Sequence, residues 1–125
     1  MKLLILLVLV AVAAAAPNDN HYDPKYDNFN IQELLDNRRL LCAYAKCFTG
    51  EGKCTAEGHD FKKWIPEGSK NGCAKCTEKQ KKLVAKFISG IQVHCAEEWE
   101  KLNKQGDPEG KHQDELKTFL DEYSE

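Results

Sequence analysis

Four of the six cysteines form two closely spaced pairs, and these are the residues whose spacing could do chemistry. Cys47 and Cys54 enclose the spacer FTGEGK, and Cys73 and Cys76 enclose AK. Sulfurs arranged in this way can hold a metal ion, exchange electrons with a substrate, or form structural disulfides. Which of these chemistries applies decides the functional class of the chain.

The spacing argues against a zinc site and against a redox centre. Each cysteine pair of a four-cysteine zinc site usually encloses about two to four residues, and the six residues between Cys47 and Cys54 are too many. A thioredoxin-like C-x-x-C motif follows a strand, and no strand is expected before Cys73. Two local disulfides, Cys47–Cys54 and Cys73–Cys76, account for all four residues. Because loops this short stabilise by only about 2–2.5 kcal/mol each, a helical core must supply most of the stability.

The N-terminus has the layout of a secretory signal peptide. Lys2 precedes an unbroken apolar run from Leu3 to Ala16, and a polar stretch follows. This run is shorter than the roughly 20 residues that span a bilayer. We therefore expect residues 1–16 to be removed, by cleavage behind Ala15 or Ala16. Residues 17–125 are then one secreted domain without a membrane span, in an oxidising compartment where disulfides persist.

Charge and composition exclude several other classes. Without Lys2 the chain has 17 basic and 20 acidic residues, so its net charge does not indicate nucleic acid or an anionic membrane as a partner. Four lysines recur along one face of a predicted helix, and we interpret them as a solvated face: Lys75, Lys79, Lys82 and Lys86. The histidines are scattered, so no metal or cofactor is expected. No Ser-His-Asp set, phosphate loop or carboxylate pair indicates an enzyme.

Apolar residues recur with helical spacing through the rest of the chain, and this predicts an all-α fold, a compact bundle of about six short helices. Asn30 and Thr55 are predicted N-caps, and Gly50 and Gly52 should end a helix. The expected helices cover 30–37, 38–48, a segment after Thr55 that Pro66 and Gly68 interrupt, a longest helix from about Cys73 to about Val93, 96–104 and about 116–123.

The cysteine spacing C-x6-C-x18-C-x2-C, with CAKCTEKQ at the second pair, resembles that of the insect chemosensory proteins, the OS-D or A10 family. Four further segments are similar to the family: KYDN, DNRRLL, EEW and DPEGK. The resemblance covers nearly the whole mature chain. It implies a six-helix secreted domain with disulfides between neighbouring cysteines and an internal apolar channel. It also implies that the channel carries small hydrophobic ligands, fatty-acid-like or semiochemical, and that Tyr26 and Trp99 line or close it.

The predicted ligand site lies where the longest helix faces the helix before Cys54, with Trp64, Ile65 and Trp99 nearby. Its expected lining residues are Tyr26, Leu41, Tyr44, Phe48, Trp64, Ile65, Val84, Phe87, Ile88, Ile91 and Trp99. Tyr26 and Tyr44 are the candidates for meeting a ligand headgroup. An alkyl chain that buries about 12 methylenes gains roughly 10 kcal/mol gross. The free-energy cost of association offsets several kcal/mol of this gain, so we expect micromolar affinity.

Cys42 and Cys95 are additional to the four cysteines of the family. Cys42 lies five positions before Cys47, about 140° around a helix, so it faces elsewhere. A Cys42–Cys95 bridge would close a loop of about 54 residues and stabilise by roughly 4 kcal/mol. Free thiols are one alternative, and a disulfide-linked dimer of this otherwise monomeric protein is the other.

Two alternative functions stay open beside the carrier. One is an extracellular signalling or developmental factor without a dedicated ligand. The other is a thiol–disulfide oxidoreductase that acts through Cys73 and Cys76. Reduction of insulin would indicate the second, and failure to bind any apolar probe would favour the first.

Overall fold

The computed structural model describes residue 22 and residues 24–124 of the chain, so the expected signal peptide lies outside the described residues. Within this part the chain forms a short 3-10 helix and six α-helices, and no strand occurs among the described residues. In chain order these are η2 (Pro24–Tyr26), α2 (Ile31–Leu35), α3 (Arg38–Thr49), α4 (Ala56–Asn71), α5 (Glu78–His94), α6 (Ala96–Gly106) and α7 (Gln113–Tyr123). The predicted all-α fold is confirmed.

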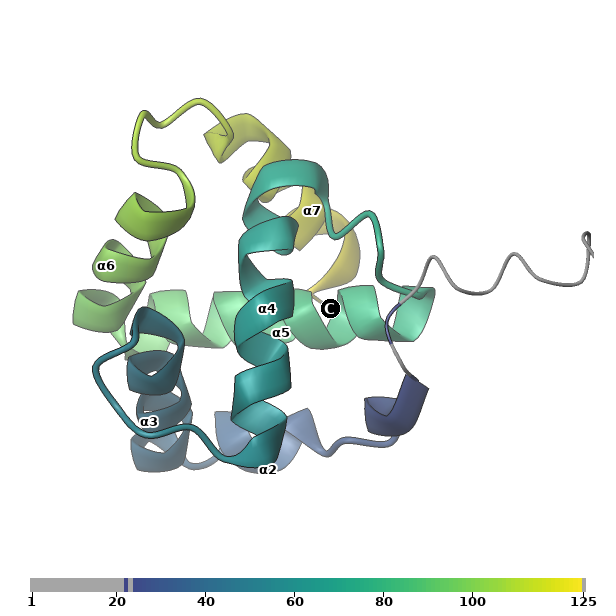
Figure 1. Ribbon diagram of the computed structural model, residues 1–125. Helices are drawn as coiled ribbons and strands as arrows, with labels where there is room; N and C mark the ends of the chain where they lie inside the picture. The colour runs from purple at the N-terminus through teal and green to yellow at the C-terminus, as the bar shows by residue number, and fades with distance from the viewer. Residues whose placement is uncertain (1–21, 23, 125) are drawn as a thin grey trace, which may run out of the picture.

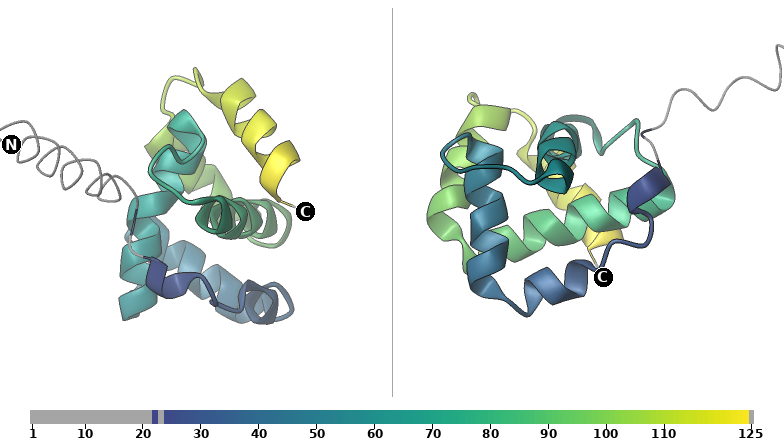
Figure 2. Two further views of the ribbon diagram at one scale, coloured as in Figure 1. Left: turned by 90° about the vertical axis from the view of Figure 1, so that its right-hand side faces the viewer. Right: turned by 60° about the horizontal axis from the view of Figure 1, so that its bottom comes forward.

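Helix α5 is the centre of the arrangement, because the other five α-helices all contact it. Helix α4 crosses α5, with α3 and α6 toward one end of α5 (Figure 1). Two further views show α7 on the opposite side of α5 from α2 and α3 (Figure 2). Phe87, Ile88 and Ile91 of α5 are 0% exposed, so this helix contributes the middle of the apolar core.

Side-chain caps fix where several helices begin and end. The Asn30 side chain accepts a hydrogen bond from the Glu33 amide at the start of α2, and the Thr55 hydroxyl accepts one from the Gly58 amide at the start of α4. Gly50 ends α3 with φ +90°, a left-handed conformation that glycine adopts without steric cost. These three boundaries agree with the sequence prediction.

The predicted start of the longest helix is wrong. Cys73 has φ +56° and cannot be part of a right-handed helix. Helix α5 begins only after Thr77, whose hydroxyl accepts from the Gln80 amide while the Gln80 side chain accepts from the Thr77 amide. This reciprocal capping box stabilises the helix start. The Cys73–Cys76 pair therefore lies in the turn between α4 and α5.

The predicted interruption at Pro66 and Gly68 is also wrong, because α4 continues to Asn71. Pro66 removes one backbone hydrogen bond, but the helix is held by its packing beyond that point. Gly68 lies against α5 and α7, where an added Cβ would come within 2.9 Å of Val84 Cγ1. The close approach that glycine permits here buries the second half of α4.

Three disulfides join the six cysteines. Cys47 is paired with Cys54 across the turn after α3, and Cys73 with Cys76 across the turn before α5. Cys42 of α3 is paired with Cys95, the residue between α5 and α6, with the two Cα atoms 5.5 Å apart. This third bridge fastens α3 to the joint from which α6 departs.

Candidate ligand-binding site

Five aromatic rings from η2, α4, α5 and the segment before α2 form a packed cluster, which we call the aromatic core: Tyr26, Phe29, Phe61, Trp64 and Phe87. The Phe61 ring is centred 5.1 Å from Phe87, 5.3 Å from Trp64 and 4.8 Å from Tyr26. Phe87 also meets α3, with its ring 5.8 Å from Tyr44 and 5.6 Å from Phe48. At these spacings the rings pack directly against one another.

A cavity of about 220 Å³ lies between α3, α4 and α6. Phe48, Ile65, Trp99 and Leu102 supply much of its apolar lining. Polar side chains on its edge are Lys62, Ser69, Lys70 and Gln105. We call this space the α4–α6 cavity. It brings together Phe48, Ile65 and Trp99, three of the predicted lining residues.

The other predicted residues lie elsewhere. Tyr26 lines a separate groove of about 270 Å³ with Phe29 and Ile31, and Tyr44 lines a pocket of about 70 Å³. The remaining six are at most 3% exposed and pack in the core: Leu41, Trp64, Val84, Phe87, Ile88 and Ile91. A role for these six in lining a continuous channel therefore stays a prediction, one that requires the core to open around a ligand.

The Tyr26 hydroxyl already has a partner. It donates a hydrogen bond of 2.6 Å to Asp60 Oδ2, and Lys25 Nζ lies 3.1 Å from the same oxygen. The Tyr26 hydrogen bond, with help from Lys25, holds the pKa of the Asp60 carboxyl below its usual value. Tyr26 could donate a hydrogen bond to a ligand headgroup only by leaving Asp60.

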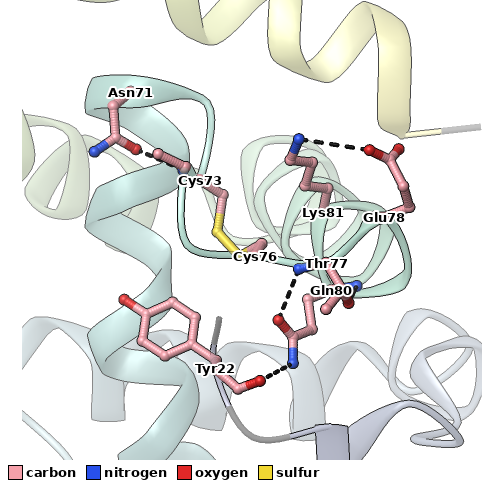
Figure 3. Close-up of a disulfide and its surroundings, with 9 residues drawn as sticks. Tyr22, Asn71, Cys73, Cys76, Thr77, Glu78, Gln80 and Lys81 are labelled. Atoms are coloured by element: carbon pink, nitrogen blue, oxygen red, sulfur yellow. Dashed lines mark hydrogen bonds and ion pairs between the residues drawn. A yellow bond between two sulfur atoms is a disulfide. The ribbon is translucent and has the colours of Figure 1, made fainter. Parts of the chain in front are cut away.

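Figure 3 shows the Cys73–Cys76 disulfide in the turn before α5, with Tyr22, Thr77 and Gln80 nearby. Cys73 is 0% and Cys76 is 3% exposed. The Tyr22 amide donates to the Lys75 carbonyl, the Gln80 side chain donates to the Tyr22 carbonyl, and the Tyr22 ring stacks on Trp64 at 5.0 Å. Because an attacking thiolate must reach a sulfur, this burial disfavours the oxidoreductase hypothesis.

Burial and a hydrogen bond to Glu67 raise the pKa of Tyr22 well above its ordinary value. Tyr22 is thus held beside the disulfide by one backbone–backbone hydrogen bond, one hydrogen bond from the Gln80 side chain and ring stacking.

No group of His, Cys, Asp or Glu side chains in residues 22 and 24–124 could hold a metal ion. Within the same part of the chain, no helix is long and apolar enough to cross a membrane. Lys75 lies in the turn before α5, so only three of the four lysines predicted to share a helix face do so: Lys79 and Lys82 are exposed, and Lys86 is half-buried.

The sequence prediction did not include several cavity residues. Leu102 follows Trp99 by three positions on α6, so a shared helical face could have identified it. Ser69 and Lys70 follow Pro66 and Gly68, the two residues at which the sequence analysis expects an interruption of the helix. Gln105 and Lys62 are polar residues outside the periodic apolar pattern, so the sequence offered no signal for them.

The model of the insect pheromone-binding family, A10/OS-D, matches residues 22–114. The chain belongs to this family. It is 39% identical over 109 residues to ejaculatory bulb-specific protein 3 of Drosophila melanogaster, covering 87% of this chain and 86% of the relative. It is 36% identical over 125 residues to allergen Tha p 1 of Thaumetopoea pityocampa, covering 100% and 99%.

The fold matches a solved structure of a chemosensory protein in complex with bromo-dodecanol. The TM-score is 0.66 at 39% sequence identity, over 81% of this chain and 98% of that chain. The resemblance inferred from the cysteine spacing is confirmed, and the chain belongs to a family of carrier and binding proteins.

Proposed function

We propose that the chain is a secreted carrier that binds small hydrophobic molecules, with the α4–α6 cavity as the starting point of its ligand site. The observation that carries this proposal is the environment of Trp99. This large aromatic residue is half-buried and borders empty space beside Phe48, Ile65 and Leu102. The relative solved with bromo-dodecanol supports a long-chain aliphatic ligand. The N-terminal apolar run and three disulfides support secretion.

The cavity must widen to accept such a ligand. Its volume of about 220 Å³ is smaller than the roughly 300–1,000 Å³ of typical ligand sites. We infer that α6 is the element that moves. Its exposed contacts with the end of α3 are polar: Lys101 pairs with Glu51 at 2.9 Å, and Gln105 donates to the Thr49 carbonyl. Exposed pairs of this kind contribute little stability.

The Cys42–Cys95 disulfide holds the N-terminal end of α6 while these contacts release. A small rotation of α6 about Cys95 would separate Trp99 and Leu102 from α4 and extend the cavity toward Phe48 and the core. Burial of an alkyl chain then supplies the driving force. Selectivity should be broad, because an apolar wall discriminates chain length only weakly.

Calorimetric titration of the mature protein with 1-dodecanol tests this function. We expect micromolar affinity, and much weaker binding of 1-hexanol because fewer methylenes are buried. Trp99→Ala should weaken dodecanol binding about tenfold or more while far-ultraviolet circular dichroism stays unchanged. Val93→Ala is the matched control, since Val93 is 74% exposed and lines none of the cavities described above. Absence of binding up to the solubility of long-chain alcohols and acids would reject the carrier and favour the signalling alternative.

A further inference from the structure

Two walls of the α4–α6 cavity, α3 and α6, are joined covalently near the start of α6. Phe48 lines the cavity from α3 and Trp99 lines it from α6. Cys42 of α3 forms a disulfide with Cys95, which directly precedes α6, and the two Cα atoms are 5.5 Å apart. Cys95 precedes Trp99 by about one helical turn, or roughly 6 Å along the axis. The disulfide therefore limits how far the two walls can separate beside Trp99.

The surroundings of this bridge leave the start of α6 little freedom. Cys95 is 3% exposed and is the single residue between the end of α5 at His94 and the start of α6 at Ala96. Arg38, at the start of α3, donates a hydrogen bond of 3.0 Å from Nε to the His94 carbonyl. The peptide chain, the disulfide and this hydrogen bond thus hold the start of α6 against both α3 and α5.

The far end of α6 is attached more weakly. It contacts the end of α3 through exposed polar groups, such as the Lys101–Glu51 pair at 2.9 Å, which water can replace. Gly106 lines the cavity at this end, and an added Cβ would meet nothing within 4 Å. Gly106 lies roughly 16 Å along the helix from Cys95, against roughly 6 Å for Trp99. A rotation of α6 about Cys95 therefore opens the Gly106 end about three times as far.

We propose that the Cys42–Cys95 disulfide determines the width of the ligand that the carrier accepts. Opening by rotation produces a wedge-shaped space, narrow beside Trp99 and wide beside Gly106. A single linear alkyl chain fits along its whole length, whereas a wider molecule is excluded from the narrow end. This inference rests on the proposed carrier function. It goes beyond that function, because ligand length is discriminated only weakly, whereas ligand width is limited by a bridge that is additional to the four cysteines of the family.

Titration with two alcohols of equal carbon number tests the width limit. 1-Dodecanol is linear, whereas cyclododecanol has its carbon atoms closed into a ring, so that two alkyl strands lie side by side. Because both alcohols can bury a similar apolar surface, a difference in affinity reports the width of the site. We expect the mature protein with its disulfides intact to bind 1-dodecanol about tenfold more tightly in calorimetry, since a misfit in a packed apolar site is costly.

Variants without one disulfide locate the effect. Cys42→Ala with Cys95→Ala should reduce the preference to about threefold or less by strengthening the binding of cyclododecanol, while the affinity for 1-dodecanol stays within about threefold. Cys47→Ala with Cys54→Ala is the matched control. This pair closes the turn after α3, and neither cysteine lines the cavity. The control variant should keep the full preference for the linear alcohol.

Lys101→Ala provides a test that keeps all three disulfides. It removes an exposed ion pair at the far end of α6 and should leave the preference unchanged within about twofold, because the narrow end stays fixed. Loss of the preference in this variant would show that the polar contacts limit the width, and would overturn the inference. This test applies even where the double cysteine variant fails to fold.

The remaining outcomes separate the width limit from the carrier function. Equal affinity of the unmodified protein for the two alcohols would overturn the width limit and leave the carrier intact. A preference that survives in the folded Cys42→Ala, Cys95→Ala variant would do the same. Failure of both alcohols to bind would overturn the carrier, and the width limit with it.

Discussion

The two tryptophans occupy two regions that are packed in opposite ways. Trp64 is 3% exposed, and its ring contacts Tyr22, Tyr26 and Phe61. Trp99 is half-buried, borders the α4–α6 cavity, and contacts no other aromatic ring of the described residues. Both residues lie on helical apolar faces in the sequence. Whether such a face becomes solid core or a ligand site thus depends on the residues opposite it.

Two glycines show the same contrast at the level of the backbone. At Gly68 an added Cβ would meet Val84 at 2.9 Å, Ile88 at 3.2 Å and Phe119 at 3.3 Å. At Gly106, which lines the cavity, a Cβ would meet nothing within 4 Å. The packing around Gly68 leaves no room for an added methyl group, whereas the space beside Gly106 does.

The largest effect is expected in the aromatic core. Phe87→Ala removes a side chain that is 0% exposed and surrounded by four rings. It should lower the free energy of unfolding by about 3–5 kcal/mol, measured by urea denaturation. Val93→Ala on the same helix is the control and should change it by less than about 0.5 kcal/mol. A loss below about 1 kcal/mol for Phe87→Ala would mean that the core is not solid.

A comparable loss of stability is expected when the Cys42–Cys95 disulfide, which joins α3 to the start of α6, is removed. Replacing Cys42 and Cys95 together by alanine opens a loop of about 54 residues and should cost roughly 4 kcal/mol in the chain-entropy model. The pair Cys47→Ala with Cys54→Ala opens a loop of about eight residues and should cost roughly 2.5 kcal/mol. Urea denaturation of both double variants measures the difference. A smaller loss for the Cys42 and Cys95 variant would contradict the idea that this bridge anchors α6.

Much of this architecture could be predicted from the sequence because its causes are local. Asn30, Thr55 and Gly50 mark helix ends through caps that involve only neighbouring residues, and the four-cysteine spacing identified the family. The errors at Cys73 and Pro66 have tertiary causes. At Cys73 a left-handed backbone conformation redirects the chain. At Pro66 the packing of Gly68 against α5 and α7 outweighs the backbone hydrogen bond that the proline removes.

The cavity itself could not be predicted. Its volume depends on how far α6 stands from α4, and periodicity within one helix carries no information about that distance. Phe48, Ile65 and Trp99 were found because they are apolar and periodic. Ser69 was not found, since a hydroxyl on an apolar face has no distinctive sequence pattern.

The two glycines allow a smaller and more specific test. Gly68→Ala introduces overpacking that typically costs about 1–3 kcal/mol, against a gain of about 1 kcal/mol in helix propensity. We expect a net loss of about 1 kcal/mol. Gly106→Ala should be neutral to within about 0.5 kcal/mol in stability and should reduce dodecanol affinity, because its methyl group enters the cavity. Equal stability losses at the two positions would remove the distinction between the regions.

The smallest effect concerns pH. Asp107, in the turn after α6, accepts hydrogen bonds from the Gln113 side chain and from the His112 and Lys111 amides. These bonds, the Gln113 bond foremost, hold the pKa of the Asp107 carboxyl below its ordinary value. Its contribution is therefore present above about pH 4 and is lost as pH falls through the lowered folded-state pKa.

Thermal unfolding between about pH 2 and pH 7 measures this contribution. Asp107→Asn should flatten the acid limb of the Tm profile, whereas Asp114→Asn, which removes a carboxylate that accepts no side-chain hydrogen bond in the described residues, should leave it unchanged. An unaltered acid limb in Asp107→Asn would show that this turn does not contribute.

Fluorescence of single-tryptophan variants tests the central claim most directly. The chain has two tryptophans, so Trp64→Phe leaves Trp99 alone and Trp99→Phe leaves Trp64 alone. On titration with 1-dodecanol, the Trp99 emission should shift saturably to shorter wavelength as the ligand displaces water from the α4–α6 cavity, while the Trp64 emission should change little. A response from Trp64 without one from Trp99 would place the ligand in the aromatic core and contradict this account.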